Sequence, residues 1–242
     1  SIQYEPKGVC LIISPWNFPL NLTIGPLVSA IAAGNTVIVK PSEMTPNISG
    51  VMKDLLASIF NEDEVATIEG AVQTSTDLLT LPFNHIFFTG APSIGKIVMA
   101  AAAKHLTSVT LELGGKSPTI IDETASIKTA AKRIAWGKFV NAGQVCIAPD
   151  YLYVHESKQD ELVTEFKKVV HTFYGDSANN STNYAQIVNL SHKERVGIML
   201  EEAKKEGAMV VCGGTIDAHS NYIEPTILTN VSMESSVMQN EI

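Results

Sequence analysis

Three cysteines are the side chains of this sequence with the strongest intrinsic nucleophilicity. Cys10 and Cys212 stand inside apolar runs, where a buried cysteine behaves as a small hydrophobic residue, so we predict structural roles for both. Cys146 follows a predicted long helix and precedes Pro149, in a segment whose backbone amides can point at bound charge. The sequence therefore favours Cys146 as the reactive thiol.

Two polar residues could assist a thiol nucleophile. Glu112 is a lone carboxylate in an apolar strand pattern, where burial would raise its pKa towards that of a useful general base. An alternating strand that turns this residue to solvent explains the same pattern. Asn17 lies between two prolines, where a rigid amide could donate to a developing oxyanion, but asparagine is also a common turn residue. The pattern alone favours the solvent-facing position for Glu112 and the turn for Asn17.

A glycine-rich segment from Gly90 to Lys96 follows a predicted strand and opens a predicted helix, so its amides could meet a phosphate. Its spacing also matches the phosphate-binding loop of Mg-nucleotide hydrolases. Ile97 stands where that loop needs Ser or Thr to hold Mg²⁺. The middle glycine of the dinucleotide fingerprint is also missing. The segment indicates a phosphate without identifying the nucleotide.

A cation and an anion, Lys40 and Glu43, flank Ser42 at the end of the second predicted strand. They could grip ribose hydroxyls, or form a solvated pair that contributes little. The six histidines show no metal-like spacing with one another or with cysteine, so we predict no metal site.

The pattern of elements predicts an α/β fold. Short β-branched runs alternate with helical patterns up to residue 114, which is typical of a parallel sheet covered by helices. Such sheets bind ligands at the carboxyl ends of their strands. The predicted strands are Gly8–Ser14, Thr36–Pro41, Val65–Gly70, His85–Gly90 and Ser108–Gly114, and the predicted helices are Leu20–Ala33, Pro46–Phe60, Thr74–Leu79 and Ser93–Lys104.

A second α/β unit is expected after the paired glycines that begin at Gly114, so we predict domains at 1–114 and 115–242. Its irregular segment, residues 142–149, carries Cys146. The predicted strands are Pro118–Asp122, Tyr151–Val154, Met209–Cys212 and Ile223–Val231, and the predicted helices are Ser126–Asn141, Lys158–Tyr174 and His192–Glu206.

Composition narrows the function classes. A chain of 242 residues with 45% hydrophobic residues can bury genuine cores, and a net charge of -8 without basic runs argues against nucleic acid and anionic membranes. No apolar stretch approaches the roughly 20 residues of a spanning helix, and residues 1–6 lack an export pattern. An odd number of widely spaced cysteines fits a reducing interior, so we predict a cytoplasmic protein.

Five motifs, in this order, resemble the aldehyde dehydrogenase superfamily: residues 15–19, 40–43, 88–95, 112–118 and 143–146. Residues 103–107 and 146–151 are most similar to the class 3 and fatty aldehyde branch. The resemblance implies a Rossmann-like, parallel-sheet NAD(P)-binding domain followed by an α/β catalytic domain that carries the thiol. It also implies truncation at both ends, and the absence of an initial Met agrees with a central fragment.

The resemblance implies a role for each matching residue. Cys146 would attack a small-molecule aldehyde, Asn17 and the Cys146 amide would hold the oxyanion, and Glu112 would activate the water that hydrolyses the thioester. The CoA-acylating branch typically lacks that base. The implied cofactor-binding residues are Ser14, Pro15, Trp16, Lys40, Ser42, Glu43, Gly90, Ser93, Gly95, Leu113, Gly114 and Glu241, although Ala91 and Pro92 replace a more usual polar pair.

The cofactor implied is NAD, with NADP as the alternative, because the carboxylate of Glu43 should repel a 2′-phosphate. The parent protein would be a homodimer. A rival hypothesis is that the truncated chain is a non-catalytic fragment that binds a dinucleotide or a partner. A third hypothesis is a Mg-nucleotide hydrolase, although Ile97 stands where such an enzyme needs Ser or Thr to hold Mg²⁺.

Overall fold

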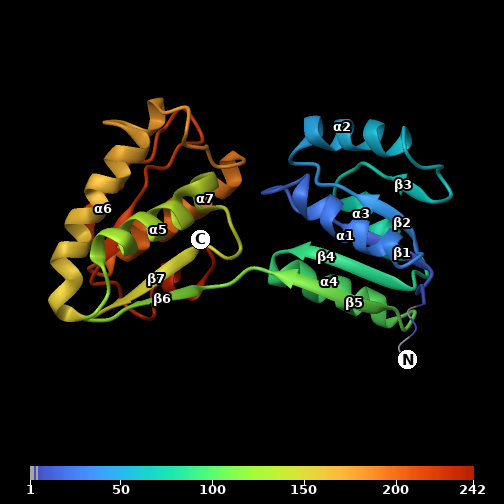
Figure 1. Cartoon of the computed structure of the whole chain (residues 1–242), viewed down its shortest axis with the longest axis horizontal. Coiled ribbons are helices and arrows are strands. Elements are labelled where there is room, and N and C mark those ends of the chain that lie inside the picture. The colour runs from blue at the N-terminus through green and yellow to red at the C-terminus, as the bar shows by residue number, and fades with distance from the viewer. Residues whose placement is uncertain (1–2, 4) are drawn as a thin grey trace. The chain divides into compact units, whose positions relative to one another are not determined.

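The computed structural model describes Gln3 and residues 5–242. The prediction that the N-terminus carries no export pattern rests in part on Ser1, Ile2 and Tyr4, which lie outside the described residues. The chain folds into two compact units, Ser1–Gly114 and Gly115–Ile242 (Figure 1). Among the described residues, every helix is too short or too polar to cross a membrane.

The first unit is built on a parallel five-stranded sheet in the order β3-β2-β1-β4-β5 (Figure 1). This confirms the predicted parallel-sheet α/β fold. Its strands are β1 (Val9–Ile13), β2 (Thr36–Lys40), β3 (Val65–Thr67), β4 (His85–Gly90) and β5 (Ser108–Leu113), and its helices are α1 (Asn21–Ala32), α2 (Pro46–Ala57), α3 (Val72–Leu78) and α4 (Pro92–Ala103).

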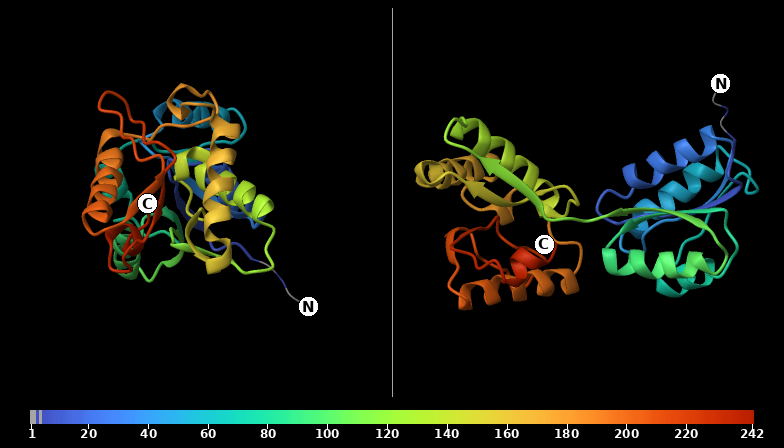
Figure 2. Two further views of the ribbon diagram at one scale, coloured as in Figure 1. Left: turned by 90° about the vertical axis from the view of Figure 1, so that its left-hand side faces the viewer. Right: turned by 90° about the horizontal axis from the view of Figure 1, so that it is seen from below.

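Helices cover both faces of this sheet, because alternate residues of a strand point to opposite sides. On β1, Cys10 and Ile12 belong to the core under α1 and α2, whereas Leu11 and Ile13 belong to the core under α3 and α4. Figure 2 shows helices on both sides of the sheet. Cys10 is buried, which agrees with its predicted structural role. Burial also raises the pKa of this thiol, which disfavours the reactive thiolate.

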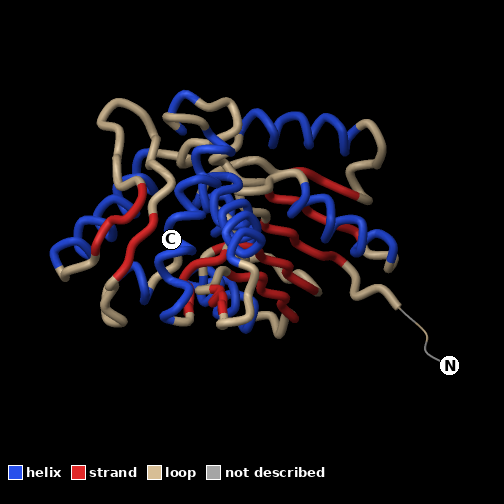
Figure 3. Tube along the Cα trace, turned by 60° about the vertical axis from the view of Figure 1, so that its left-hand side comes forward, coloured by secondary structure: helices blue, strands red, loops and turns tan. Residues whose placement is uncertain are grey.

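The named strands of the second unit form two separate two-stranded sheets. β6 (Ser117–Ile121) pairs in parallel with β7 (Pro149–Val154), and β8 (Met209–Cys212) pairs antiparallel with β9 (Ile227–Thr229). Residues 213–226 join β8 to β9 without a regular helix or a named strand (Figure 3). Its main helices are α5 (Ile127–Phe139), α6 (Gln159–Tyr174), α7 (Leu190–Lys205) and α8 (Ser236–Gln239).

The core of the second unit joins α5 and α6 to β6. Ala131 and Phe139 of α5 pack with Phe166 of α6 in one buried cluster, and Val237 of α8 packs on α7 in another. One sequence prediction is wrong here. The predicted strand Ile223–Val231 shrinks to β9, and residues 236–239, for which no element was predicted, form the short helix α8.

Candidate functional site

Four strand ends of the first unit bring candidate residues to one sheet edge. Because β2, β1, β4 and β5 are parallel neighbours, their carboxyl ends lie side by side. Ser14 directly follows β1, and its backbone amide donates to the Lys40 carbonyl at 3.1 Å. The Ser14 hydroxyl is buried and makes no hydrogen bond within the part of the chain that the structure describes. A buried hydroxyl without a partner is unusual in folded proteins, and this one lies at the sheet edge where α/β proteins bind ligands.

Asn17 lies in the turn between β1 and α1 and is half-buried. Its side-chain Oδ1 accepts a hydrogen bond from the Phe18 amide at 3.0 Å. This bond fixes the orientation of the amide, so the donor atom Nδ2 lies on the opposite side. Asn17 can therefore be both a turn residue and an oxyanion donor, since the bond that shapes the turn also orients its Nδ2.

Lys40 and Glu43 form an ion pair at the end of β2. The Nζ–Oε2 distance is 2.9 Å, with the lysine side chain 3% exposed and the glutamate 37% exposed. Burial pushes the pKa of Glu43 up, but the hydrogen bond from Lys40, a backbone hydrogen bond and the lysine charge outweigh it, so the pKa lies below its ordinary value. Glu43 is thus held as an anion.

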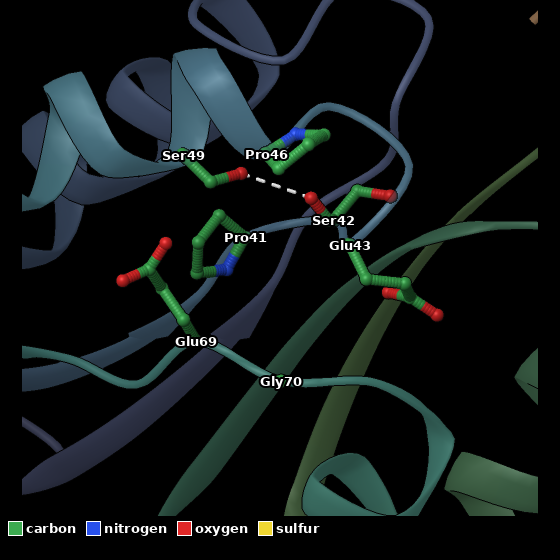
Figure 4. A pocket seen from close by; sticks show the side chains of 7 residues that line it. All are labelled: Pro41, Ser42, Glu43, Pro46, Ser49, Glu69 and Gly70. Atoms are coloured by element: carbon green, nitrogen blue, oxygen red, sulfur yellow. Dashed lines mark hydrogen bonds between the residues drawn. The ribbon is translucent and has the colours of Figure 1, made fainter.

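A pocket opens beside this pair. Its wall is formed by Pro41, Ser42 and Glu43 on one side and by Glu69 and Gly70 on another (Figure 4). Ser49 of α2 donates to the Ser42 carbonyl at 2.9 Å, which ties the loop to the helix (Figure 4). Carboxylates at the rim suit hydroxyl donors such as those of a ribose, and they disfavour a phosphate.

The glycine-rich segment opens α4. Ser93 is exposed in the first turn of this helix, where orphan amides and the helix dipole favour an anion. Gly95 is buried, and a Cβ there would come within 2.9 Å of a Leu113 methyl group. The structure therefore shows close packing of α4 on β5 as one reason for this glycine.

Glu112 lies on β5, opposite Thr89 of β4, and its side chain is exposed. Leu113 is also exposed, and Gly114 is half-buried. The expectation that Glu112 is buried in its strand is therefore wrong for this unit. The solvent-facing alternative is what the structure has, because β5 forms the edge of the described sheet and its outer positions alternate with inward ones.

In the second unit, Cys146 follows an unusual turn. After α5 the chain passes through Asn141, Ala142 and Gly143 with φ of 51°, 54° and 81°. A Cβ on Gly143 would lie 3.1 Å from the Lys138 carbonyl, so this position needs glycine on steric as well as conformational grounds. Cys146 is a free, half-buried cysteine. Cys212, predicted to be structural, is also half-buried.

A charged cluster lies next to this turn. The Lys116 ammonium is 2.6 Å from the Asp150 carboxylate, whose side chain is only 5% exposed, and it also donates to the Val237 carbonyl at 2.5 Å. One lysine thus ties together the start of β6, the strand that follows Cys146, and α8. Burial lowers the pKa of Lys138, with the Asp150 carboxylate opposing this shift and the Lys116 charge adding to it.

Glu241 belongs to the same cluster. Arg195 of α7 donates to its backbone carbonyl at 2.8 Å. Burial raises the pKa of the Glu241 carboxyl group, and the negative charge of Asp150 raises it further. The positive charges of Arg195, Lys138 and Lys116 lower this pKa, but they offset the rise only in part. The predicted cofactor carboxylate therefore sits in a partly desolvated, mainly cationic setting.

The structure gathers the predicted residues into two groups, one in each unit. Sequence reasoning missed Lys116, Lys138, Asp150 and Gln144. Lys116, Gln144 and Asp150 lie in the motifs at residues 112–118, 143–146 and 146–151. A charged or amide side chain in a motif does not indicate which distant segment it contacts. Lys138 had a usable signal, since it is a lysine in the last turn of a helix that leads directly to the thiol.

Comparison with known proteins shows which family this chain resembles. The model of the Aldehyde dehydrogenase family matches residues 1–242. The chain is 50% identical over 241 residues to "Aldehyde dehydrogenase, dimeric NADP-preferring" of Mus musculus, covering 100% of this chain and 52% of the relative. It is 48% identical over 241 residues to "Aldehyde dehydrogenase family 3 member A2" of Rattus norvegicus, covering 100% of this chain and 49% of the relative.

A solved structure shows the same fold. A mutant of aldehyde dehydrogenase C from Pseudomonas syringae, in complex with NAD⁺ and octanal, superposes with a TM-score of 0.90 at 31% identity, over 98% of this chain and 50% of that one. The chain spans about half the length of the curated relatives it matches. The sequence resemblance, including its class 3 and fatty aldehyde direction, is confirmed.

Proposed function

The chain belongs to the aldehyde dehydrogenase family, and from that premise we propose that the natural polypeptide carrying these residues oxidises an aldehyde to a carboxylic acid, with Cys146 as the nucleophile. The observation that supports this most directly is a half-buried thiol that follows a turn of three left-handed residues. Such a turn is costly for non-glycine residues, and costly backbone of this kind clusters at active sites.

The proposed first step is attack of the Cys146 thiolate on the aldehyde carbon. A C–S bond forms and the carbonyl π electrons move to oxygen, which gives a thiohemiacetal oxyanion. Asn17 Nδ2 and the Cys146 amide would donate to that oxygen, where fixed dipoles lower the barrier most. A nicotinamide, when bound, would supply the acceptor for the hydride that leaves the same carbon. The acyl group then remains on Cys146 as a thioester.

Glu112 would complete the cycle by taking a proton from water as the water oxygen attacks the thioester carbon. The C–S bond then breaks, the acid leaves and the Cys146 thiolate returns. An exposed carboxylate on an edge strand can reach water readily. Because the CoA-acylating branch typically lacks this base, Glu112 favours hydrolysis over transfer to a thiol.

For the cofactor, we propose NAD, with NADP as the alternative. The ribose hydroxyls would meet Lys40 and Glu43, the unpartnered Ser14 hydroxyl would gain a partner, and Ser93 would lie near the pyrophosphate. The Glu43 anion favours NAD, while Lys40 beside it limits the penalty for NADP. The remaining proposed contacts are Pro15, Trp16, Ser42, Gly90, Gly95, Leu113, Gly114 and Glu241.

Steady-state kinetics of the natural polypeptide test the proposal. Cys146→Ala should reduce NADH formation from an aldehyde by at least about 10³-fold, because the covalent route is lost. Cys212→Ala is the matched control, a second half-buried thiol that should keep turnover within about two-fold. Wild-type turnover by Cys146→Ala would contradict the proposal. Glu112→Gln should lower the steady-state rate and leave the first turnover intact.

A second candidate function applies to the 242 residues taken alone. Because the chain covers about half of its relatives, this piece could bind a dinucleotide or a partner without turning over. Quenching of tryptophan fluorescence by NAD, without NADH formation on addition of aldehyde, would favour it. NADH formation by the 242-residue chain would exclude it.

Location and assembly are further proposals. Three free cysteines fit a reducing compartment, which supports the cytoplasm. The mouse relative is named dimeric, which supports a homodimer for the natural polypeptide. Light scattering on that polypeptide measures the second point directly, and a monomer would contradict it.

A further inference from the structure

The turn before Cys146 is a strained segment that needs external support. Asn141 and Ala142 have φ/ψ of 51°/33° and 54°/30°, and Gly143 follows with φ of 81°. Asparagine and glycine tolerate this left-handed region, but the Cβ of an alanine clashes with its own backbone there. Ala142 is therefore the costly member, and the surrounding contacts must hold it in place.

Gln144 makes those contacts with its side-chain amide. Its Nε2 donates to the Asn141 carbonyl at 2.9 Å, across the turn, and to the Gln186 carbonyl at 3.2 Å. Its Oε1 accepts from the Val188 amide at 2.9 Å. The Gln144 backbone amide donates to the same Asn141 carbonyl at 3.1 Å. One side chain thus closes the turn and joins it to a second segment.

That second segment is itself well anchored. Ile187, between the two partners of Gln144, is buried, and its amide donates to the Asn221 carbonyl at 2.9 Å. The Tyr184 hydroxyl donates to the Ile223 carbonyl at 3.1 Å. The amide of Gln144 therefore ties a strained turn to a fixed support, two residues before the thiol.

We propose that Gln144 is a positioning residue: its side-chain amide clamps the left-handed turn 141–143 to the segment 186–188 and so fixes the direction in which Cys146 presents its sulfur. The inference rests on the proposed role of Cys146 as nucleophile. A thiol that must reach a carbonyl carbon within a narrow range of distance and angle gains from such preorganisation, and small misplacements reduce the rate strongly.

The test uses Gln144→Ala, Gln144→Glu and Gln144→Ala combined with Ala142→Gly, all in the natural polypeptide. Gln144→Ala should lower kcat by about 10- to 100-fold, with KM for NAD within about two-fold, since only the approach of sulfur changes. It should also slow alkylation of Cys146 by iodoacetamide and change the pH profile of that reaction. Gln159→Ala removes the same atoms from an exposed site of this unit and should change neither.

Rescue distinguishes positioning from general destabilisation. Gln144→Glu keeps the acceptor for the Val188 amide but sets a carboxylate oxygen against the Asn141 and Gln186 carbonyl oxygens, so its kcat should also fall well below wild type. Ala142→Gly removes the left-handed penalty, so the loss caused by Gln144→Ala should shrink by about three-fold or more in the A142G background.

Two outcomes overturn the inference. The first is wild-type kcat together with a wild-type alkylation profile in folded Gln144→Ala. If that variant does not fold, the second applies, which is wild-type kcat in Gln144→Glu. Neither touches the proposed function as long as Cys146→Ala is inactive. Turnover by Cys146→Ala would instead remove the proposed function itself.

Discussion

The two units position their functional side chains in different ways. In the first unit, parallel strands deliver Ser14, Lys40 and Glu112 to one sheet edge, so topology alone sets their places. In the second unit, Cys146 sits after a strained turn that Gln144 and nearby contacts stabilise. The positions of the functional side chains in the first unit therefore depend on the core beneath the sheet. The position of Cys146 in the second unit depends on individual polar contacts.

The largest effect should come from the core of the first unit. Ile12 is 1% exposed at the centre of the sheet, so Ile12→Ala should lower the free energy of unfolding by about 2–5 kcal/mol, through lost burial and a new cavity. Ile120→Ala, at a position 77% exposed, is the control and should change it by less than about 0.5 kcal/mol. Urea unfolding measures both. Equal losses of unfolding free energy in the two variants would contradict the claim that the core of the first unit holds its functional side chains in place.

The next effect belongs to the polar contacts of the second unit. Asp150→Asn leaves the Lys116 ammonium without its carboxylate and should cost about 2–4 kcal/mol of unfolding free energy. Glu165→Gln is a matched control, because the Lys168–Glu165 pair has the same 2.6 Å distance but a lysine side chain that is 63% exposed. That change should cost at most about 1 kcal/mol. Similar losses for the two pairs would show that burial does not set their strength.

The smallest effect is a pH dependence in the first unit. Burial lowers the pKa of His85, and the Lys7 charge lowers it further. Because the folded pKa lies below the unfolded value of about 6.5, His85 contributes stability above that pH and loses it as pH falls through the folded pKa. Lys7→Met should raise the folded pKa and so weaken the fall of Tm on acidification below about pH 6.5. An unchanged slope in this variant would contradict the assignment.

Sequence reasoning went furthest where backbone periodicity decides the outcome. β4 has the predicted bounds, and the sheet edge that carries Lys40 and Glu43 follows from parallel strands. It failed where long-range contacts override local pattern. Residues 236–239 fold as α8, with Val237 packed on α7, although the local pattern predicted no helix there.

In the candidate site, too, the features set by local sequence were predicted and those set by long-range contacts were not. The thiol and its loop were predicted from the motif, but the left-handed conformation of Ala142 was not, because alanine carries no signal for it. The Lys116–Asp150 pair joins residues that are distant along the chain. The exposure of Glu112 depends on β5 being at the sheet edge, and strand order is set by topology rather than by local sequence.

The most direct measurement is the mass of the covalent intermediate. The natural polypeptide with Glu112→Gln would be mixed with an aldehyde and NAD, quenched in acid within seconds, and mapped by peptide mass spectrometry. We expect about one equivalent of NADH per subunit and an acyl adduct on the peptide that contains Cys146. NADH formation with the adduct on Cys10 or Cys212, or with no adduct at any time, would contradict the assignment of Cys146 as the nucleophile.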